Sequence, residues 1–154
     1  MKSIGVFPGS FDPFTKGHED IVRRFVPLFD EVIIAIGVNS KKQYMFTQDS
    51  RQNHIEELFK DESKVSVETF QGLTVDFCKQ KKAQYLLRGI RNATDADYER
   101  SIAQMNQQLS GIETLFLMCD AALSPINSSI VREIKKNNGD ISAFVTKDEL
   151  LIIN

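Results

Sequence analysis

The residues best suited to chemistry lie near the N-terminus, in the segment GSFDPFTKGH that spans residues 9–18. Gly9 and Gly17 permit tight backbone paths, and a helical pattern begins where the segment ends. The first turn of a helix exposes N–H groups and a positive dipole end, which together bind anions. From spacing alone, His18 either reaches a bound phosphate or caps the helix, and both interpretations stay open.

Two further segments carry basic residues next to apolar runs. Lys41 and Lys42 follow the second apolar run, although a lysine pair is most often a solvated edge. Arg88 and Arg91 flank Gly89 directly after another apolar run. Burying a guanidinium at the end of a strand costs free energy unless the group pairs with an anion. Its planar pair of N–H donors matches the spacing of phosphoryl oxygens. The arginine pair therefore favours a phosphate site.

A third segment, residues 125–130, reads PINSSI and runs into a helical pattern. Asn127, Ser128 and Ser129 offer amide, hydroxyl and backbone donors at a helix N-terminus. An ordinary N-cap explains one such residue well and three less well.

Apolar runs and helical patterns alternate along the chain, and this alternation positions these residues. The predicted strands are residues 4–7, 32–38, 65–70, 85–88 and 115–118, and the predicted helices are 18–29, 49–60, 74–82, 95–109 and 128–136. The pattern predicts a single α/β domain over residues 1–154 with a doubly wound five-stranded parallel sheet. Ligands of such sheets bind beyond the carboxyl ends of the strands, where all these segments fall.

Several local features are also predicted. Thr47 and Thr94 are plausible N-caps, and residues 146–149 match a capping box that opens a last short helix. His54 has no partner at metal-ligand spacing and is expected as a surface or flanking residue. The helix at 95–109 places four apolar residues on one stripe: Tyr98, Ile102, Met105 and Leu109.

Composition excludes several classes of protein. The net charge of −2 argues against a nucleic-acid surface or a polybasic membrane contact. No apolar run approaches the roughly 18 residues that span a bilayer. The two cysteines, Cys78 and Cys119, stand far apart and are expected as reduced thiols. We expect a cytoplasmic protein without nucleic-acid or membrane partners.

The motifs together resemble a known family. Residues 9–18 look like the T/H-x-G-H motif of the nucleotidyltransferase superfamily, and residues 126–132 resemble its second, serine-rich motif. Within that superfamily the chain is similar to the bacterial phosphopantetheine adenylyltransferases nearly end to end. Supporting matches are Lys42 before Met45 and Phe46, the RGIR sequence at 88–91, Tyr98 with Glu99, and Met105 with Asn106.

The resemblance implies a Rossmann-like nucleotidyltransferase fold and an enzyme that joins ATP and 4′-phosphopantetheine. The products would be dephospho-coenzyme A and pyrophosphate, with Mg²⁺ required and a homohexamer as the usual assembly. The implied catalytic residues are His18, Lys42 and Arg88. Ser10, Lys42, Thr74 and Arg88 would contact phosphopantetheine. The implied ATP contacts are Ser10, Phe11, His18, Gly89, Ile90, Arg91, Glu99, Leu123, Ser124, Pro125, Ile126, Asn127, Ser128 and Ser129.

Two positions depart from the family pattern. Ser10 stands where many relatives have threonine, which keeps the hydroxyl. Leu123 stands where relatives often have an aromatic ring, so it cannot stack on a purine in the same way.

Three other functions compete with this one. A related nucleotidyltransferase could use CTP or nicotinamide mononucleotide, but Lys42 and the RGIR sequence argue against it. A non-catalytic nucleotide or coenzyme A binding module would be favoured by loss of the motif histidine or of both serines, and all three are present. A flavodoxin-like electron carrier would lack the basic loops.

Overall fold

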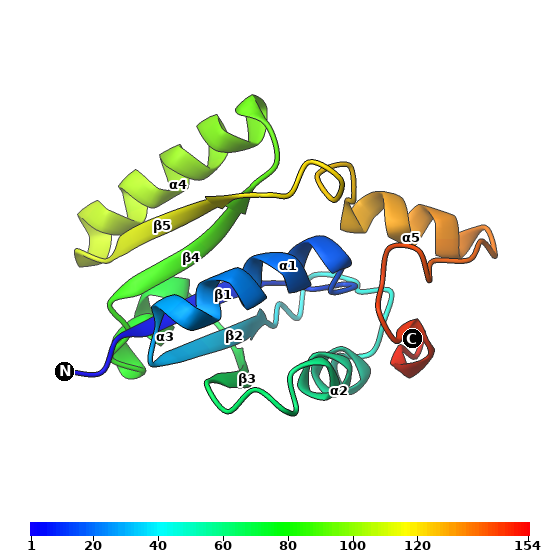
Figure 1. Cartoon of the computed structure of the whole chain (residues 1–154), viewed down its shortest axis with the longest axis horizontal. Coiled ribbons are helices and arrows are strands. Elements are labelled where there is room, and N and C mark those ends of the chain that lie inside the picture. The colour runs from blue at the N-terminus through cyan, green and yellow to red at the C-terminus, as the bar shows by residue number, and fades with distance from the viewer.

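A computed structural model describes the whole chain from Met1 to Asn154. Five parallel strands form one sheet in the order β3-β2-β1-β4-β5 (Figure 1). They are β1 (Ile4–Gly9), β2 (Glu31–Gly37), β3 (Val65–Phe70), β4 (Tyr85–Ile90) and β5 (Glu113–Met118). The predicted doubly wound parallel α/β fold is confirmed.

Helices connect the strands, as predicted, with ends shifted by a few residues. They are α1 (Lys16–Phe25), α2 (Gln48–Leu58), α3 (Thr74–Gln80), α4 (Ala93–Ser110) and α5 (Ser128–Lys136). The pattern predicted at 18–29 divides into α1 and a 3₁₀ turn, η1 (Val26–Leu28), in which Pro27 is the second residue. A second 3₁₀ turn, η2 (Asp148–Leu150), lies near the C-terminus.

The core lies on both faces of the sheet, because successive strand residues point to opposite sides. Phe7 of β1 packs with Ile21 of α1 and Ile55 of α2 in one buried cluster. Its neighbour Val6 packs with Val75 of α3 in another. Helix α4 lies against α3, β4 and β5. The central strands are thus covered on both sides, which explains their nearly continuous apolar sequences.

A third cluster lies beyond the carboxyl edge of the sheet, where α5 meets the C-terminal segment (Figure 1). Phe46 is buried there between Val131 and Ile141. The last residues pair with the segment that precedes α2: Phe46 and Ile153 form an antiparallel bridge. The N–H of Asn154 donates to the Met45 carbonyl at 2.9 Å. The C-terminal segment therefore holds the loop between β2 and α2 in place through backbone pairing.

Some local predictions are confirmed and others are wrong. Thr47 caps α2 with its side chain, as predicted. Asn92, not Thr94, caps α4, because the helix begins at Ala93, two residues before its predicted start at Asp95. The predicted capping box at 146–149 is absent: Lys147 precedes η2 with a φ of +53°, and the Thr146 hydroxyl donates to Glu19.

The predicted surface position of His54 is also wrong. His54 is fully buried, and its Nε2 lies 2.7 Å from the Thr146 carbonyl, because the C-terminal segment covers this face of α2. The four apolar residues of the α4 stripe are exposed in the single chain, since the inward face of α4 carries Glu99 instead. The most exposed of them are Tyr98 at 68% and Met105 at 66%. None of the helices has the length and apolar character needed to cross a bilayer.

Candidate active site

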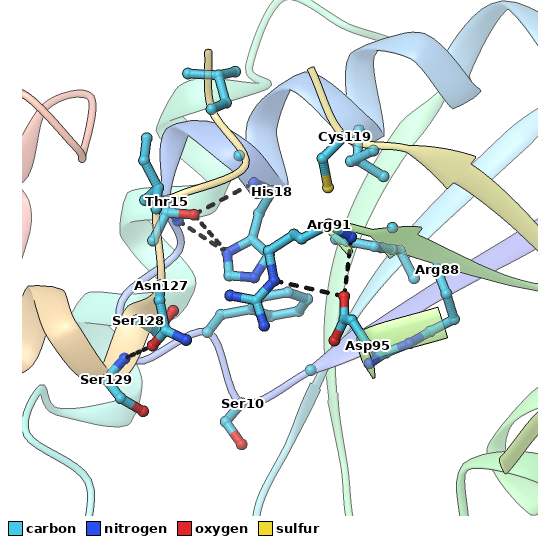
Figure 2. A pocket seen from close by; sticks show the side chains of 18 of the residues that line it. Ser10, Thr15, His18, Arg88, Arg91, Asp95, Cys119, Asn127, Ser128 and Ser129 are labelled. Atoms are coloured by element: carbon cyan, nitrogen blue, oxygen red, sulfur yellow. Dashed lines mark hydrogen bonds and ion pairs between the residues drawn. The ribbon is translucent and has the colours of Figure 1, made fainter. Parts of the chain in front are cut away.

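A cavity of about 330 Å³ lies at the carboxyl edge of the sheet. It is bounded by the ends of β1 and β4 and by the N-termini of α1 and α5 (Figure 2). Eleven of the predicted ATP-binding residues line it, and so does Arg88 from the acceptor set; the eleven are Ser10, Phe11, His18, Gly89, Arg91, Glu99, Leu123, Ile126, Asn127, Ser128 and Ser129. We call it the nucleotide cavity.

A second cavity of about 250 Å³, the acceptor cavity, adjoins the first. Thr74 of α3 lines it, and its wall also includes Ile102 and Asn106 of α4. The two cavities share five residues: Pro8, Gly9, Ser10, Arg88 and Glu99. The common wall is therefore the end of β1 with the Arg88 side chain, and a group held there would face both cavities.

The remaining predicted residues lie elsewhere. Lys42 lines neither cavity, but its Nζ donates to Ser10 Oγ at 3.2 Å, which places the ammonium beside the common wall. Ile90 and Ser124 line none of the three principal cavities. Pro125 lines a separate apolar pocket near α5. Their contacts with ATP stay predictions.

His18 is oriented by a reciprocal capping arrangement with Thr15, the N-cap of α1. The Thr15 N–H donates to Nδ1 of His18 at 3.0 Å, and the Thr15 hydroxyl lies 3.2 Å from the same nitrogen. Because Nδ1 accepts this backbone hydrogen bond, the proton of a neutral imidazole lies on Nε2. The two sequence interpretations are thus compatible: one nitrogen caps the helix and the other remains a donor.

The surroundings of His18 keep its ring neutral. Desolvation, followed by the nearby cations Arg88 and Arg91, lowers the pKa of His18 from 6.5 to about 3. The rings of Phe11 and Phe14 lie 5.2 and 5.4 Å from the imidazole, centroid to centroid. A neutral imidazole with its proton on Nε2 suits hydrogen-bond donation rather than proton transfer near neutral pH.

Arg88 is held in place by two different acceptors. Its Nε and Nη2 donate to the two oxygens of Glu99 at 2.9 and 2.5 Å, and its Nη1 donates to the Pro8 carbonyl at 2.7 Å. A guanidinium has five N–H groups, so one on Nη1 and one on Nη2 stay available for a ligand. Glu99 lines the nucleotide cavity and directs its carboxylate to Arg88, and its contact with ATP stays a prediction.

Arg91 extends from the end of β4 into the nucleotide cavity, with Asp95 beside it (Figure 2). Asp95 accepts from the Arg91 N–H at 3.0 Å, and its carboxylate lies 3.6 Å from Arg91 Nε. This longer ion pair leaves the end of the guanidinium free to contact an anion.

Two helix N-termini face the nucleotide cavity. In α1, Lys16 N donates to the Phe144 carbonyl and His18 N to Thr15 Oγ1, whereas Gly17 N has no acceptor within the chain. In α5, Asn127 Oδ1 accepts from the N–H groups of Ser129 and Ile130. Each terminus thus keeps one N–H without an acceptor in the chain, Gly17 in α1 and Ser128 in α5, and Asn127 is an N-cap whose amide NH₂ remains a donor.

Sequence reasoning missed several residues of the nucleotide cavity, among them Asp12, Thr15, Asp95, Cys119 and Arg132. Arg132 had a visible signal, because it stands one helical turn after Ser129 and its Nη2 donates to the Ser129 hydroxyl at 3.0 Å. Asp12 had none, because its carboxylate accepts from the backbone of Met45 and Phe46, a contact that only the fold creates.

The side chains that could ligate a metal do not form a metal site within the chain. No group of three His, Cys, Asp or Glu side chains is arranged to hold an ion. The three carboxylates of the nucleotide cavity already accept from protein donors, Asp12 from backbone, Asp95 from Arg91 and Glu99 from Arg88. A divalent ion would therefore need most of its oxygen ligands from elsewhere.

Comparison with known proteins gives one consistent family. A model described as cytidylyltransferase-like matches residues 6–134. A phosphopantetheine adenylyltransferase of Flavobacterium johnsoniae is 54% identical over 140 residues, covering 91% of this chain and 92% of the relative. One of Porphyromonas gingivalis is 46% identical over 150 residues, covering 97% and 98%.

Solved structures support the same fold. A putative nicotinate-nucleotide adenylyltransferase from Vibrio parahaemolyticus superposes with a TM-score of 0.70 at 18% identity, covering 97% of both chains. The Rossmann-like nucleotidyltransferase fold is thereby confirmed. With high identity over nearly the full length of its relatives, the chain belongs to the cytidylyltransferase-like nucleotidyltransferases and, among them, to the phosphopantetheine adenylyltransferases.

Proposed function

We propose that this chain transfers the adenylyl group of ATP to 4′-phosphopantetheine, in the penultimate step of coenzyme A synthesis. The observation that carries the proposal is the common wall of the two cavities, where Ser10 and Arg88 face both. A nucleotide in one cavity and a phosphorylated acceptor in the other would meet at this wall. The homologues at 46–54% identity support the same substrates.

The reaction needs no general base. A phosphate oxygen of the acceptor, already anionic near neutral pH, forms a bond to the α-phosphorus of ATP. The bond from this phosphorus to the bridging oxygen breaks, and its electron pair leaves with pyrophosphate. The protein must align two polyanions and stabilise the charge on the transferred group, so catalysis is positioning and electrostatic stabilisation.

Three residues would bind the attacking phosphate and the α-phosphoryl group that is transferred. Lys42 and the two free N–H groups of Arg88 would hold the attacking phosphate at the common wall. His18 would donate from Nε2 to an α-phosphoryl oxygen, a role that suits a ring kept neutral and fixed through Nδ1. Each group would stabilise developing charge without exchanging a proton.

The departing pyrophosphate would bind at the helix N-termini. Arg91, Gly17, Ser128 and Ser129 line the nucleotide cavity together with His18. They would bind the departing pyrophosphate through charge and N–H donors. Phe11 and Leu123 would pack against the nucleoside. We further propose that Mg²⁺ enters as the complex with ATP, since the cavity's carboxylates already have protein partners.

The proposal extends to assembly as a homohexamer. The α4 stripe and the neighbouring edge strand β5 expose Tyr98, Met105, Leu109 and Met118 at 59–68% of their surface. An apolar area of this kind on one face is typical of a subunit interface. Light scattering after gel filtration should give six chains for the unsubstituted protein and smaller species for Met105→Asp. A monomeric unsubstituted protein would refute the assembly. A cytoplasmic location stays a prediction.

Pyrophosphate release tests the proposed reaction. The protein with Mg²⁺ and ATP should release pyrophosphate with 4′-phosphopantetheine and not with nicotinamide mononucleotide, and CTP should not replace ATP. Dephospho-coenzyme A should form in equal amount, as followed by chromatography. Equal rates with another acceptor, or no release with 4′-phosphopantetheine, would contradict the proposal. Binding of ATP without turnover would instead favour a non-catalytic module.

A further inference from the structure

Tyr44 lies in the same loop as Lys42, between β2 and α2, and two cations lie over its ring. Lys42 Nζ is 5.4 Å from the ring centroid, and Arg51 Cζ is 4.3 Å from it. The Tyr44 hydroxyl accepts from the Asn39 N–H at 3.1 Å and lies 3.4 Å from the Gly37 carbonyl. The ring is therefore tied to the end of β2, and its position does not depend on the exposed lysine.

Arg51 supports the ring from inside the molecule. Its side chain is only 1% exposed and forms no ion pair, although it carries a charge. Its Nη1 donates to the Ser10 carbonyl at 2.6 Å, and its Nε donates to the Phe46 carbonyl at 3.2 Å. Arg51 thus joins the loop of Lys42 to the end of β1, where the common wall lies.

Lys42 differs from Arg88 and Arg91, because no carboxylate pairs with it. Arg88 is paired with Glu99 and Arg91 with Asp95. The Lys42 ammonium instead contacts the Ser10 hydroxyl and the face of Tyr44, both of which are neutral. An aromatic face attracts a cation without cancelling its charge, whereas a carboxylate would compete with an incoming phosphate.

We propose that Tyr44 is a positioning residue for the adenylyl transfer: its ring, which also contacts Arg51, holds the Lys42 ammonium beside Ser10, unneutralised, for the acceptor's phosphate. The inference rests on the proposed function, which assigns that phosphate to Lys42. Ordering a lysine side chain is entropically costly, and a preformed contact reduces the cost at the moment of binding.

Substituting the ring tests the proposal through a split between kinetic constants. Tyr44→Leu should raise KM for phosphopantetheine about three- to tenfold, the range typical of one cation–π contact, with KM for ATP nearly unchanged. Tyr44→Phe keeps the ring and should retain most of the affinity. An unchanged KM for phosphopantetheine in Tyr44→Leu, or an equal defect in Tyr44→Phe, would overturn the proposal.

A double-mutant cycle separates positioning from general stability. If Tyr44 acts through Lys42, then adding Tyr44→Leu to Lys42→Ala should cause no further loss, whereas additive losses would overturn the proposal. Tyr85→Leu is the matched control. Tyr85 lies at the start of β4, far from the carboxyl edge, and its ring packs on Phe29 at 5.8 Å. It should lower stability without raising KM for phosphopantetheine selectively.

Two further measurements test the role of Tyr44: one preserves the shape of the side chain, and the other does not depend on enzyme activity. Fluorinated phenylalanines at position 44 preserve shape but weaken the attraction of the ring for cations, so KM for phosphopantetheine should rise with each fluorine. NMR of the unliganded protein should show the Lys42 ε-methylene protons shifted upfield by the ring, and the shift should vanish in Tyr44→Leu. An unshifted Lys42 would overturn the proposal. An unsubstituted protein without turnover would instead refute the proposed function.

Discussion

Glu99 grips Arg88 through two parallel hydrogen bonds of 2.5 and 2.9 Å, and the pair forms part of the wall that separates the two cavities. The carboxylate is buried, while the guanidinium is one-third exposed. The carboxylate thus determines where the remaining N–H groups of Arg88 point.

Glu99→Gln should therefore disturb the reaction without removing any group that contacts phosphate. The amide offers one acceptor in place of two, so the guanidinium loses its fixed plane. Since small misplacements of aligned groups are costly, we expect kcat/KM for phosphopantetheine to fall about ten- to hundredfold. Initial rates at varied acceptor would show this. Asp97→Asn, an exposed carboxylate on the same helix, is the control and should leave the rates unchanged.

His18→Ala should lower kcat by about 10²–10³-fold, the typical loss for one donor that stabilises transition-state charge. Binding of ATP should change little, because many other groups surround the phosphates. Steady-state kinetics and calorimetry with ATP would measure the two effects. A kcat within a few-fold of the unsubstituted value would show that the imidazole does not face the transferred group.

Acid should destabilise the protein through its histidines before its carboxylates protonate. The pKa of His18 is lowered to about 3, and burial also lowers that of His54, whereas an unfolded histidine titrates near 6.5. Between these values the unfolded chain binds protons that the folded chain does not. The contribution of each histidine to stability is complete above pH 6.5 and is lost as the pH falls below that value, in the case of His18 down to about 3.

Urea unfolding at several pH values would measure this loss. For each histidine the free energy of unfolding should fall with a slope of up to about 1.4 kcal/mol per pH unit. His54→Gln should reduce the slope while leaving the cavities intact. Equal slopes in both proteins would mean that His54 protonates as readily in the folded state as in the unfolded one.

Gly17→Ala should affect thermal stability and the KM for ATP differently. A Cβ at Gly17 would meet no atom closer than Thr15 Oγ1 at 3.5 Å, and alanine favours a helix by about 0.5–1 kcal/mol. The protein should keep or gain thermal stability. The new methyl group would stand where phosphate approaches the free Gly17 N–H, so KM for ATP should rise.

A comparison at Gly9 sharpens this test. There a Cβ would come within 2.7 Å of the Phe11 ring, so Gly9→Ala should lower stability itself. If Gly17→Ala left KM for ATP unchanged, the α1 N-terminus would not be a phosphate site.

The sequence predicted the sheet and the placement of the motifs because both follow from local patterns. Continuous apolar runs such as the one in β2 mark strands covered on both faces, and parallel strands bring their carboxyl ends to one edge. The loops with His18, Arg88 and Asn127 could therefore be grouped before any contact was known.

Features that depend on distant contacts could not be predicted in this way. The buried face of α2 includes polar side chains beside Ile55: Arg51 and His54 are covered because the C-terminal segment and the β1 loop supply carbonyl acceptors. No periodicity reveals such acceptors. The apolar stripe of α4 was visible in the sequence, but such a stripe indicates only that something covers it, and within one chain nothing does.

The pairing of the C-terminal residues with the loop before α2 has a practical consequence for handling this protein. The Asn154 side chain donates to the Tyr44 carbonyl at 2.8 Å, so the two ends of the chain are not equivalent places for a fusion. An affinity tag, fluorophore or immobilisation linker after Asn154 would adjoin the lysine loop. The same attachment before Met1, at the opposite edge of the sheet, would leave that loop untouched (Figure 1).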